Sequence, residues 1–274
     1  MQRSLTTTDG VIIAYRIEGP ANGPVVVLCH GICASGRQFA ADAERFAALG
    51  YRVIVPDLRA HGASGAPLLD GGDFSIARLA ADMQAVLDDA GAAQVHWLGN
   101  SLGGIVGLDL LSRAPLRFLS FATFGTAYSL NLPRAAPTVM PLVYRLLGPH
   151  RLGQITAAFT TADPKARELI AEGIAAFDPG PGERIADAVR AYDLAPAAQQ
   201  FDGPILVIRG GRDRAVNLAL GHTFAAMTGH PRFERIDIED AGHCANLDVP
   251  DEMCRALDDF WRRAGAAPIA ADGY

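Results

Sequence analysis

Short apolar runs alternate with longer amphipathic stretches along most of this chain of 274 residues. Runs of Val, Ile and Leu that are bounded by turn residues are typical of strands buried on both faces of a sheet. Apolar side chains three and four positions apart are typical of helices that bury one face. The expected strands are residues 25–28, 52–56, 94–98, 118–124, 205–208 and 233–238, and the expected helices lie near 37–49, 75–90, 102–113, 218–227 and 251–263.

A hairpin is expected ahead of this alternation. Residues 6–10 end in Asp-Gly and residues 11–15 are mainly apolar, a pattern typical of two strands joined by a tight turn. Strands that alternate with helices after an initial hairpin indicate an α/β fold. The hairpin and the later runs together predict a mostly parallel, eight-stranded sheet with helices on both faces.

The alternation stops in the middle of the chain. Residues 126–195 carry helical patterns and turn prolines, and we find no convincing strand among them. Because the alternation resumes at residue 205, this segment is interpreted as a helical insertion between two strands of one sheet. The predicted core is therefore residues 1–125 and 196–274.

Composition narrows the class of protein. Half of the residues are hydrophobic and 20% are charged, as in a soluble globular protein, and the net charge of −6 argues against nucleic acid or an anionic membrane as partner. Residues 1–10 lack a signal-peptide pattern, and no apolar run approaches the roughly 20 residues of a membrane helix, so a cytoplasmic location is expected. The four cysteines include no C-x-x-C pair, so neither a metal site nor a disulfide framework is expected.

A G-x-S-x-G pattern lies between an expected strand and an expected helix, at Gly99-Asn100-Ser101-Leu102-Gly103. Such a turn lifts a serine hydroxyl above the sheet, and glycines two positions before and after the serine permit it sterically. Ser101 also lies at a helix start, where free N–H groups favour developing negative charge. The plainer alternative is an ordinary helix cap in a tight loop.

A nucleophilic serine needs a base, and the base needs an orienting group. Among the histidines, His243 follows the last expected strand, at the carboxyl edge where open α/β sheets place their sites. His61 lies in a turn and is expected to be structural. Asp213 follows the strand at 205–208, whereas no acid follows the strand before it, so Asp213 is the expected orienting acid.

The oxyanion of the transition state needs hydrogen-bond donors. One expected donor is the backbone N–H of Leu102, the residue after the serine. The other is expected from the loop after the strand at 25–28, at the N–H of Ile32.

Together these motifs resemble the α/β-hydrolase superfamily. The segments that carry the resemblance are His30-Gly31, Asp57-Leu58-Arg59-Ala60-His61-Gly62-Ala63-Ser64, Gly99-Asn100-Ser101-Leu102-Gly103-Gly104, Gly211-Arg212-Asp213 and Ala241-Gly242-His243. The match spans about residues 6–261, and the order Ser, Asp, His is the order of that fold. In the family, the segment equivalent to 126–195 is a helical cap, which implies a cap here that shapes the pocket and excludes water.

The resemblance implies a cofactor-free hydrolase without a metal, acting through an acyl-enzyme on a largely apolar small-molecule ester or lactone. A serine nucleophile disfavours the dehalogenase and epoxide hydrolase branches, which use aspartate. Carbon–carbon bond hydrolysis of ring-cleavage products, and a weakly catalytic ligand-binding protein, are the alternatives. The sequence leaves open whether the protein is a monomer or a homodimer. Residues expected to line the pocket are Cys33, Phe124, Tyr128, Met140 and Cys244.

Overall fold

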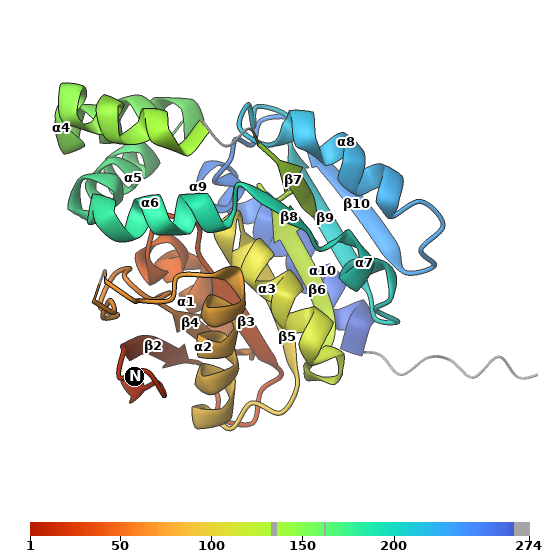
Figure 1. The fold of residues 1–274 in the computed structure, drawn as a ribbon. Helices are drawn as coiled ribbons and strands as arrows, with labels where there is room; N and C mark the ends of the chain where they lie inside the picture. Colours follow the sequence, from red (N-terminus) through yellow and green to blue (C-terminus); the bar gives the residue numbers. More distant parts are fainter. Residues whose placement is uncertain (69, 133–135, 162, 266–274) are drawn as a thin grey trace, which may run out of the picture.

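One eight-stranded sheet forms the centre of the molecule (Figure 1). The computed structural model describes residues 1–68, 70–132, 136–161 and 163–265, without the side chains of 136–146. The strand order is β1-β2-β4-β3-β5-β6-β9-β10. The strands are β1 (Gln2–Thr6), β2 (Ile12–Glu18), β3 (Val25–Cys29), β4 (Arg52–Pro56), β5 (Val95–Asn100), β6 (Phe118–Phe124), β9 (Ile205–Gly210) and β10 (Phe233–Ile238).

The hairpin strands β1 and β2 are antiparallel to their neighbours, and the other six strands run parallel. The predicted fold class and mostly parallel sheet are therefore confirmed. The predicted bounds of β4, β6 and β10 agree with the structure, whereas β3, β5 and β9 continue one or two residues further. Those added residues include Asn100 and Gly210, which seldom occur in strands, so propensity alone ends the strands early.

Helices cover both faces of the sheet (Figure 1). On one face the core includes side chains of α2 (Ile76–Asp89) and α3 (Leu102–Arg113), and on the other it includes α1 (Ala40–Ala48) and α10 (Pro250–Gly265). Neighbouring strand residues alternate between the two cores, as the pleat requires. Val27 and Cys29 face the α2–α3 side, and Val26 and Leu28 face the α1–α10 side.

Several short helices and turns lie in the connections between the main strands and helices. These short elements are the 3₁₀ turns η1 (Gly36–Phe39) and η2 (Pro115–Arg117) and the helices α7 (Ala195–Gln199), α8 (Asn217–Ala226) and α9 (Ala245–Asp248). Ser75 caps α2, because its side-chain oxygen accepts the N–H of Arg78.

The segment between β6 and β9 is mainly helical, with α4 (Ala136–Thr160), α5 (Pro164–Ala176) and α6 (Pro179–Ala188) above one end of the sheet (Figure 1). Helix α4 is broken at Gly148, whose φ is +73°. The expectation that this segment holds no strand is wrong. Strands β7 (Ser129–Asn131) and β8 (Ala191–Asp193) pair antiparallel, but each has three residues, too few to show an alternating pattern.

Candidate active site

Ser101 lies at a sharp turn between the end of β5 and the start of α3. Its φ of +52° is unusual for a residue with a side chain, and such a conformation costs about 1–3 kcal/mol. The flanking glycines make the turn possible. A Cβ at Gly99 would lie 2.4 Å from the Gly104 nitrogen, and one at Gly103 would lie 2.2 Å from the Cys29 carbonyl oxygen. The strained, closely packed turn presents the hydroxyl at the carboxyl edge of the sheet.

His243 and Asp213 are joined by a hydrogen bond at this same edge. Nδ1 of His243 lies 3.0 Å from Oδ2 of Asp213, which is almost wholly buried. The other carboxylate oxygen accepts the backbone N–H groups of Ala215 and Val216. Burial acts to raise the pKa of Asp213, but the bond and attraction to His243 and these two N–H groups outweigh it, so the pKa lies below its ordinary value. The carboxylate is therefore held ionised beside the imidazole.

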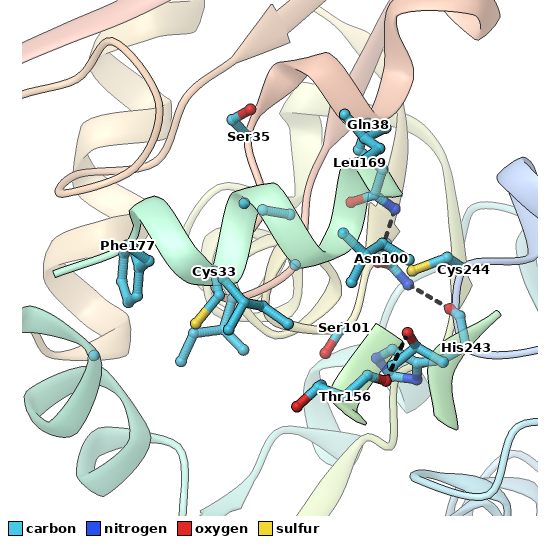
Figure 2. A pocket seen from close by; sticks show the side chains of 18 of the residues that line it. Cys33, Ser35, Gln38, Asn100, Ser101, Thr156, Leu169, Phe177, His243 and Cys244 are labelled. Atoms are coloured by element: carbon cyan, nitrogen blue, oxygen red, sulfur yellow. Dashed lines mark hydrogen bonds between the residues drawn. The ribbon is translucent and has the colours of Figure 1, made fainter. Parts of the chain in front are cut away.

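A cavity of about 450 Å³ joins Ser101 and His243 (Figure 2). Its floor includes Gly31, Ile32 and Asn100, and residues of α4, α5 and α6 form much of its wall. Most of the lining is apolar. Such a cavity, with a few polar groups at one place, is typical of a small-molecule site.

Two of the five residues expected to line this cavity do so, namely Cys33 and Cys244. Burial raises the pKa of each of these thiols to about 12, so both are neutral near pH 7. The expectation that Phe124 and Tyr128 line the cavity is wrong. Both residues are buried in the core and are not among the lining residues. Met140 lies outside the residues whose side chains the structure describes.

The ring of Phe124 packs edge-on against that of Phe39 in the core, with centroids 6.2 Å apart. The hydroxyl of Tyr128 lies 3.3 Å from that of Thr123. Phe124 ends the predicted strand and Tyr128 comes shortly after it, which suggested the site. The pleat of β6 turns the side chain of Phe124 toward the core. The ring of Tyr128 packs against that of Phe121, with centroids 6.3 Å apart.

Helix α5 supplies lining residues that the sequence reading missed. Leu169, Ile170, Ile174 and Phe177 lie at or just beyond this helix and face the cavity. They are spaced one, four and three residues apart, which places them in one stripe along a helix. This spacing is the feature of the sequence that could have identified them. A stripe of this kind is equally typical of a core contact, so only the packing of α5 over Ser101 assigns it to the cavity.

Polar side chains at the floor of the cavity join the serine turn to the histidine loop. Nδ2 of Asn100 donates to the carbonyl oxygens of Phe124 and His243. Its Oδ1 accepts from Nε2 of Gln38 at 2.9 Å (Figure 2). The N–H of His243 donates in turn to the carbonyl of Thr160, the last residue of α4. The histidine loop is therefore fixed both to the sheet and to the inserted helices.

The two expected oxyanion donors lie at this site. Ile32 lines the cavity. Leu102 is the first residue of α3, and a first helical residue has no carbonyl one turn earlier to accept its N–H.

Two kinds of feature are absent from the residues that the structure describes. None of their helices combines the length and apolar character needed to cross a bilayer. Among the same residues, no group of three or more His, Cys, Asp or Glu side chains is arranged to hold a metal ion.

Comparison with known proteins gives the family. Residues 24–170 match the family model described as the alpha/beta hydrolase fold. The 3-hydroxybutyrate-oligomer hydrolase of Cupriavidus necator is 27% identical over 90% of this chain and 92% of its own length. The 3-oxoadipate enol-lactonase 2 of Acinetobacter baylyi is 26% identical over 94% and 96%. The solved enol-lactonase of Burkholderia xenovorans is 26% identical, with a TM-score of 0.82 over 95% of this chain and all (100%) of its own. The chain is therefore a hydrolase that belongs to the α/β-hydrolase fold family.

Proposed function

We propose that this protein hydrolyses a carboxylic ester or lactone through an acyl-enzyme, with Ser101 as nucleophile, His243 as base and Asp213 as the residue that orients it. The observation that carries the proposal is the hydrogen bond from His243 to Asp213 beside the cavity that Ser101 lines. A neutral serine hydroxyl is a weak nucleophile, and an oriented imidazole supplies the missing activation.

In the first step Nε2 of His243 removes the proton from the Ser101 hydroxyl as its oxygen attacks the ester carbonyl carbon. The imidazolium that forms is stabilised by the carboxylate of Asp213, which stays ionised. The carbonyl oxygen becomes an oxyanion, which the N–H groups of Ile32 and Leu102 bind. His243 then gives the proton to the leaving alcohol, and an acyl ester remains on Ser101.

Water completes the reaction by the same steps. His243 takes a proton from the water, whose oxygen attacks the acyl ester. Collapse of the second tetrahedral intermediate returns the proton to Ser101 and releases the acid. No cofactor is required for either half-reaction.

The cavity favours a neutral, apolar acyl group. The part of its wall formed by Leu169, Ile170 and Ile174 of α5 offers no hydrogen-bonding side chain to a polar acyl chain. Two relatives with nearly full-length coverage are named as a hydroxybutyrate-oligomer hydrolase and an enol-lactonase, and both names describe ester-bond hydrolysis. We propose that residues 126–195 act as a cap, because helices from this segment form that wall.

Hydrolysis of a short-to-medium-chain p-nitrophenyl ester series by wild type and Ser101→Ala tests the proposal. We expect kcat to fall by about 10⁴–10⁶ in the variant, because the nucleophile is lost. The acyl chain length that gives the highest kcat/KM indicates the length of acyl group that the pocket accommodates. An inactive wild type would contradict general esterase activity, and lactones and ring-cleavage dienoates would then be assayed in its place. Ligand binding without product release would indicate the ligand-binding alternative.

A further inference from the structure

Two buried histidines, His30 and His61, connect the loop that carries Ile32 to the loop that follows β4. Nε2 of His30 accepts the backbone N–H of Leu58 at 3.1 Å. Nε2 of His61 accepts the backbone N–H of Cys33 at 3.2 Å. Each loop therefore contributes one ring and one N–H, and the ring centroids lie 5.1 Å apart. We call this reciprocal pair of bonds the histidine clasp.

Hydrogen bonding fixes the tautomer of each ring. Nδ1 of His30 lies 2.8 Å from the carbonyl oxygen of Gly31, and Nδ1 of His61 lies 2.8 Å from that of Arg59. Because a carbonyl oxygen can only accept, each Nδ1 carries the proton and each Nε2 keeps a free lone pair. Burial lowers the pKa of His30 to about 4 and that of His61 to about 3, so both rings are neutral near pH 7.

The clasp acts on the two peptide units that flank Ile32. The Gly31 carbonyl, which accepts from His30, belongs to the same planar peptide as the Ile32 N–H. In a trans peptide these two groups point in opposite directions, so fixing the carbonyl aims the N–H. The next peptide ends in the Cys33 N–H, which His61 holds. Cys33 has a φ of +59°, a strained value that persists only where its surroundings enforce it.

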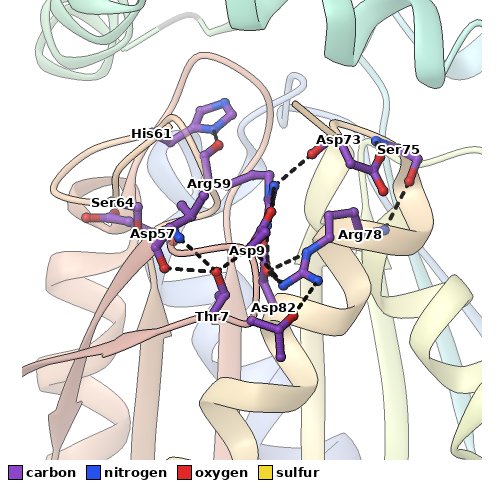
Figure 3. A network of polar contacts seen from close by, with 12 residues as sticks. Thr7, Asp9, Asp57, Arg59, His61, Ser64, Asp73, Ser75, Arg78 and Asp82 are labelled. Carbon is purple, nitrogen blue, oxygen red and sulfur yellow. Dashed lines mark hydrogen bonds and ion pairs between the residues drawn. The ribbon is translucent and has the colours of Figure 1, made fainter. Parts of the chain in front are cut away.

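A rigid base supports the His61 side of the clasp (Figure 3). Arg59 is wholly buried, and its Nε and Nη2 donate to the two carboxylate oxygens of Asp82 at 2.5 and 2.8 Å. The carboxylate of Asp57 accepts the N–H of Ala63 at 2.8 Å and that of Gly36 at 2.6 Å. The loop that presents His61 is therefore held by buried and charge-assisted bonds.

We propose that His30 and His61 are positioning residues that aim the Ile32 N–H at the oxyanion by fixing the peptide units on either side of it. The inference rests on the proposed function, in which that N–H is an oxyanion donor. Neither ring of the clasp is among the residues that line the cavity, although the His61 ring stacks on that of Phe177, a lining residue, with centroids 4.4 Å apart. Loss of the bond from His61 to the Cys33 N–H should therefore weaken binding of the transition state more than binding of the ground state.

A matched pair of substitutions at His61 tests the clasp. His61→Gln keeps an acceptor at the same number of bonds from Cβ as Nε2, and His61→Met has similar length without a comparable acceptor. We expect kcat for the best p-nitrophenyl ester to fall about 10–100-fold in His61→Met, less than the loss of a whole donor, with KM nearly unchanged. His61→Gln is expected to retain activity within a few-fold.

A trifluoromethyl ketone with the same acyl chain gives a second readout, because its adduct with Ser101 places an oxyanion at the same site. We expect its Ki to rise in His61→Met by the same factor as kcat/KM falls. The Ki of the unfluorinated methyl ketone, a ground-state mimic, should not change. Equal activity and equal ketone affinity in the Gln and Met variants would overturn the clasp, whereas an inactive wild type that binds no trifluoromethyl ketone would overturn the proposed function.

Imidazole ¹⁵N NMR of the wild type keeps the test independent of how the variants fold. We expect the rings of His30 and His61 to be neutral, with a proton on Nδ1 and none on Nε2. A proton on Nε2 of either ring would prevent it from accepting an N–H and would contradict the inference.

Discussion

Nδ2 of Asn100 donates a hydrogen bond to the backbone carbonyl of His243 at 3.1 Å, although 143 positions separate the two residues in sequence. The residue before the proposed nucleophile thus holds the loop that carries the proposed base. Asn100 is almost wholly buried, so the bond lies away from competing water. The loop that carries His243 is therefore tied to the serine turn by a contact at the floor of the cavity.

Asn100→Ala should lower the free energy of unfolding by about 1–3 kcal/mol, because the buried carbonyl group of Phe124 and the partly buried one of His243 lose a donor. It should also lower kcat, since the His243 loop is released. Urea unfolding and ester hydrolysis measure the two effects. Asn131→Ala, at an exposed position in β7, is the control and should change stability by less than about 0.5 kcal/mol. A stable, fully active Asn100→Ala protein would contradict this role.

Asp213→Asn should lower kcat by about 10⁴ with little change in fold, because an amide donor in place of Oδ2 favours the wrong imidazole tautomer. Steady-state kinetics and circular dichroism measure the two properties. The control is Asp240→Asn in the neighbouring loop, where the carboxylate forms an exposed ion pair with Arg212. The control should keep full activity. If the two variants were equally active, Asp213 would not be the orienting acid.

Ala60→Gly should raise the free energy of unfolding by about 0.5–1 kcal/mol. Ala60 has a φ of +64°, a conformation that costs an L-residue about 1–2 kcal/mol and that glycine adopts freely. The greater freedom of glycine in the unfolded chain offsets part of the gain. Ala63→Gly, three positions along and exposed, should bring a small loss instead. Chemical denaturation of both variants checks the difference in sign.

Stability should fall as the pH is lowered from about 6.5 toward 4. Burial lowers the pKa of His30 and of His96 to about 4, and that of His61 to about 3, whereas the ordinary value is about 6.5. In this range the unfolded chain takes up protons that the folded protein does not bind, so unfolding becomes more favourable. Asp42, whose pKa burial raises to about 6, acts in the opposite direction.

Urea unfolding at several pH values measures this slope. His30 acts to lower the pKa of His61 further, while Asp57 acts to raise it. His61→Gln should reduce the slope by up to about 1.4 kcal/mol per pH unit, which corresponds to one proton. A slope that stays the same in this variant would show that His61 does not titrate differently in the folded and unfolded states.

Local sequence pattern determined the elements of this fold. Strands β4, β6 and β10 and helix α3 have their predicted bounds, because burial on both faces of a sheet or on one face of a helix repeats over a few residues. The serine turn was equally local, since Gly99 and Gly103 are needed within two residues of Ser101. The strands β7 and β8 were missed because each is too short to show a period.

Tertiary structure decided what the loops do. The order of β5, β6, β9 and β10 in the sheet brings Asp213 and His243 to one edge beside Ser101, and strand order has no local signature. Likewise, the pleat placed Phe124 in the core, and the packing of α5 placed its apolar stripe over the cavity. His61 was expected to be structural, but its bond to the Cys33 N–H depends on two loops meeting after the chain has folded. Contacts between distant segments follow from packing geometry, which a single stretch of sequence does not contain.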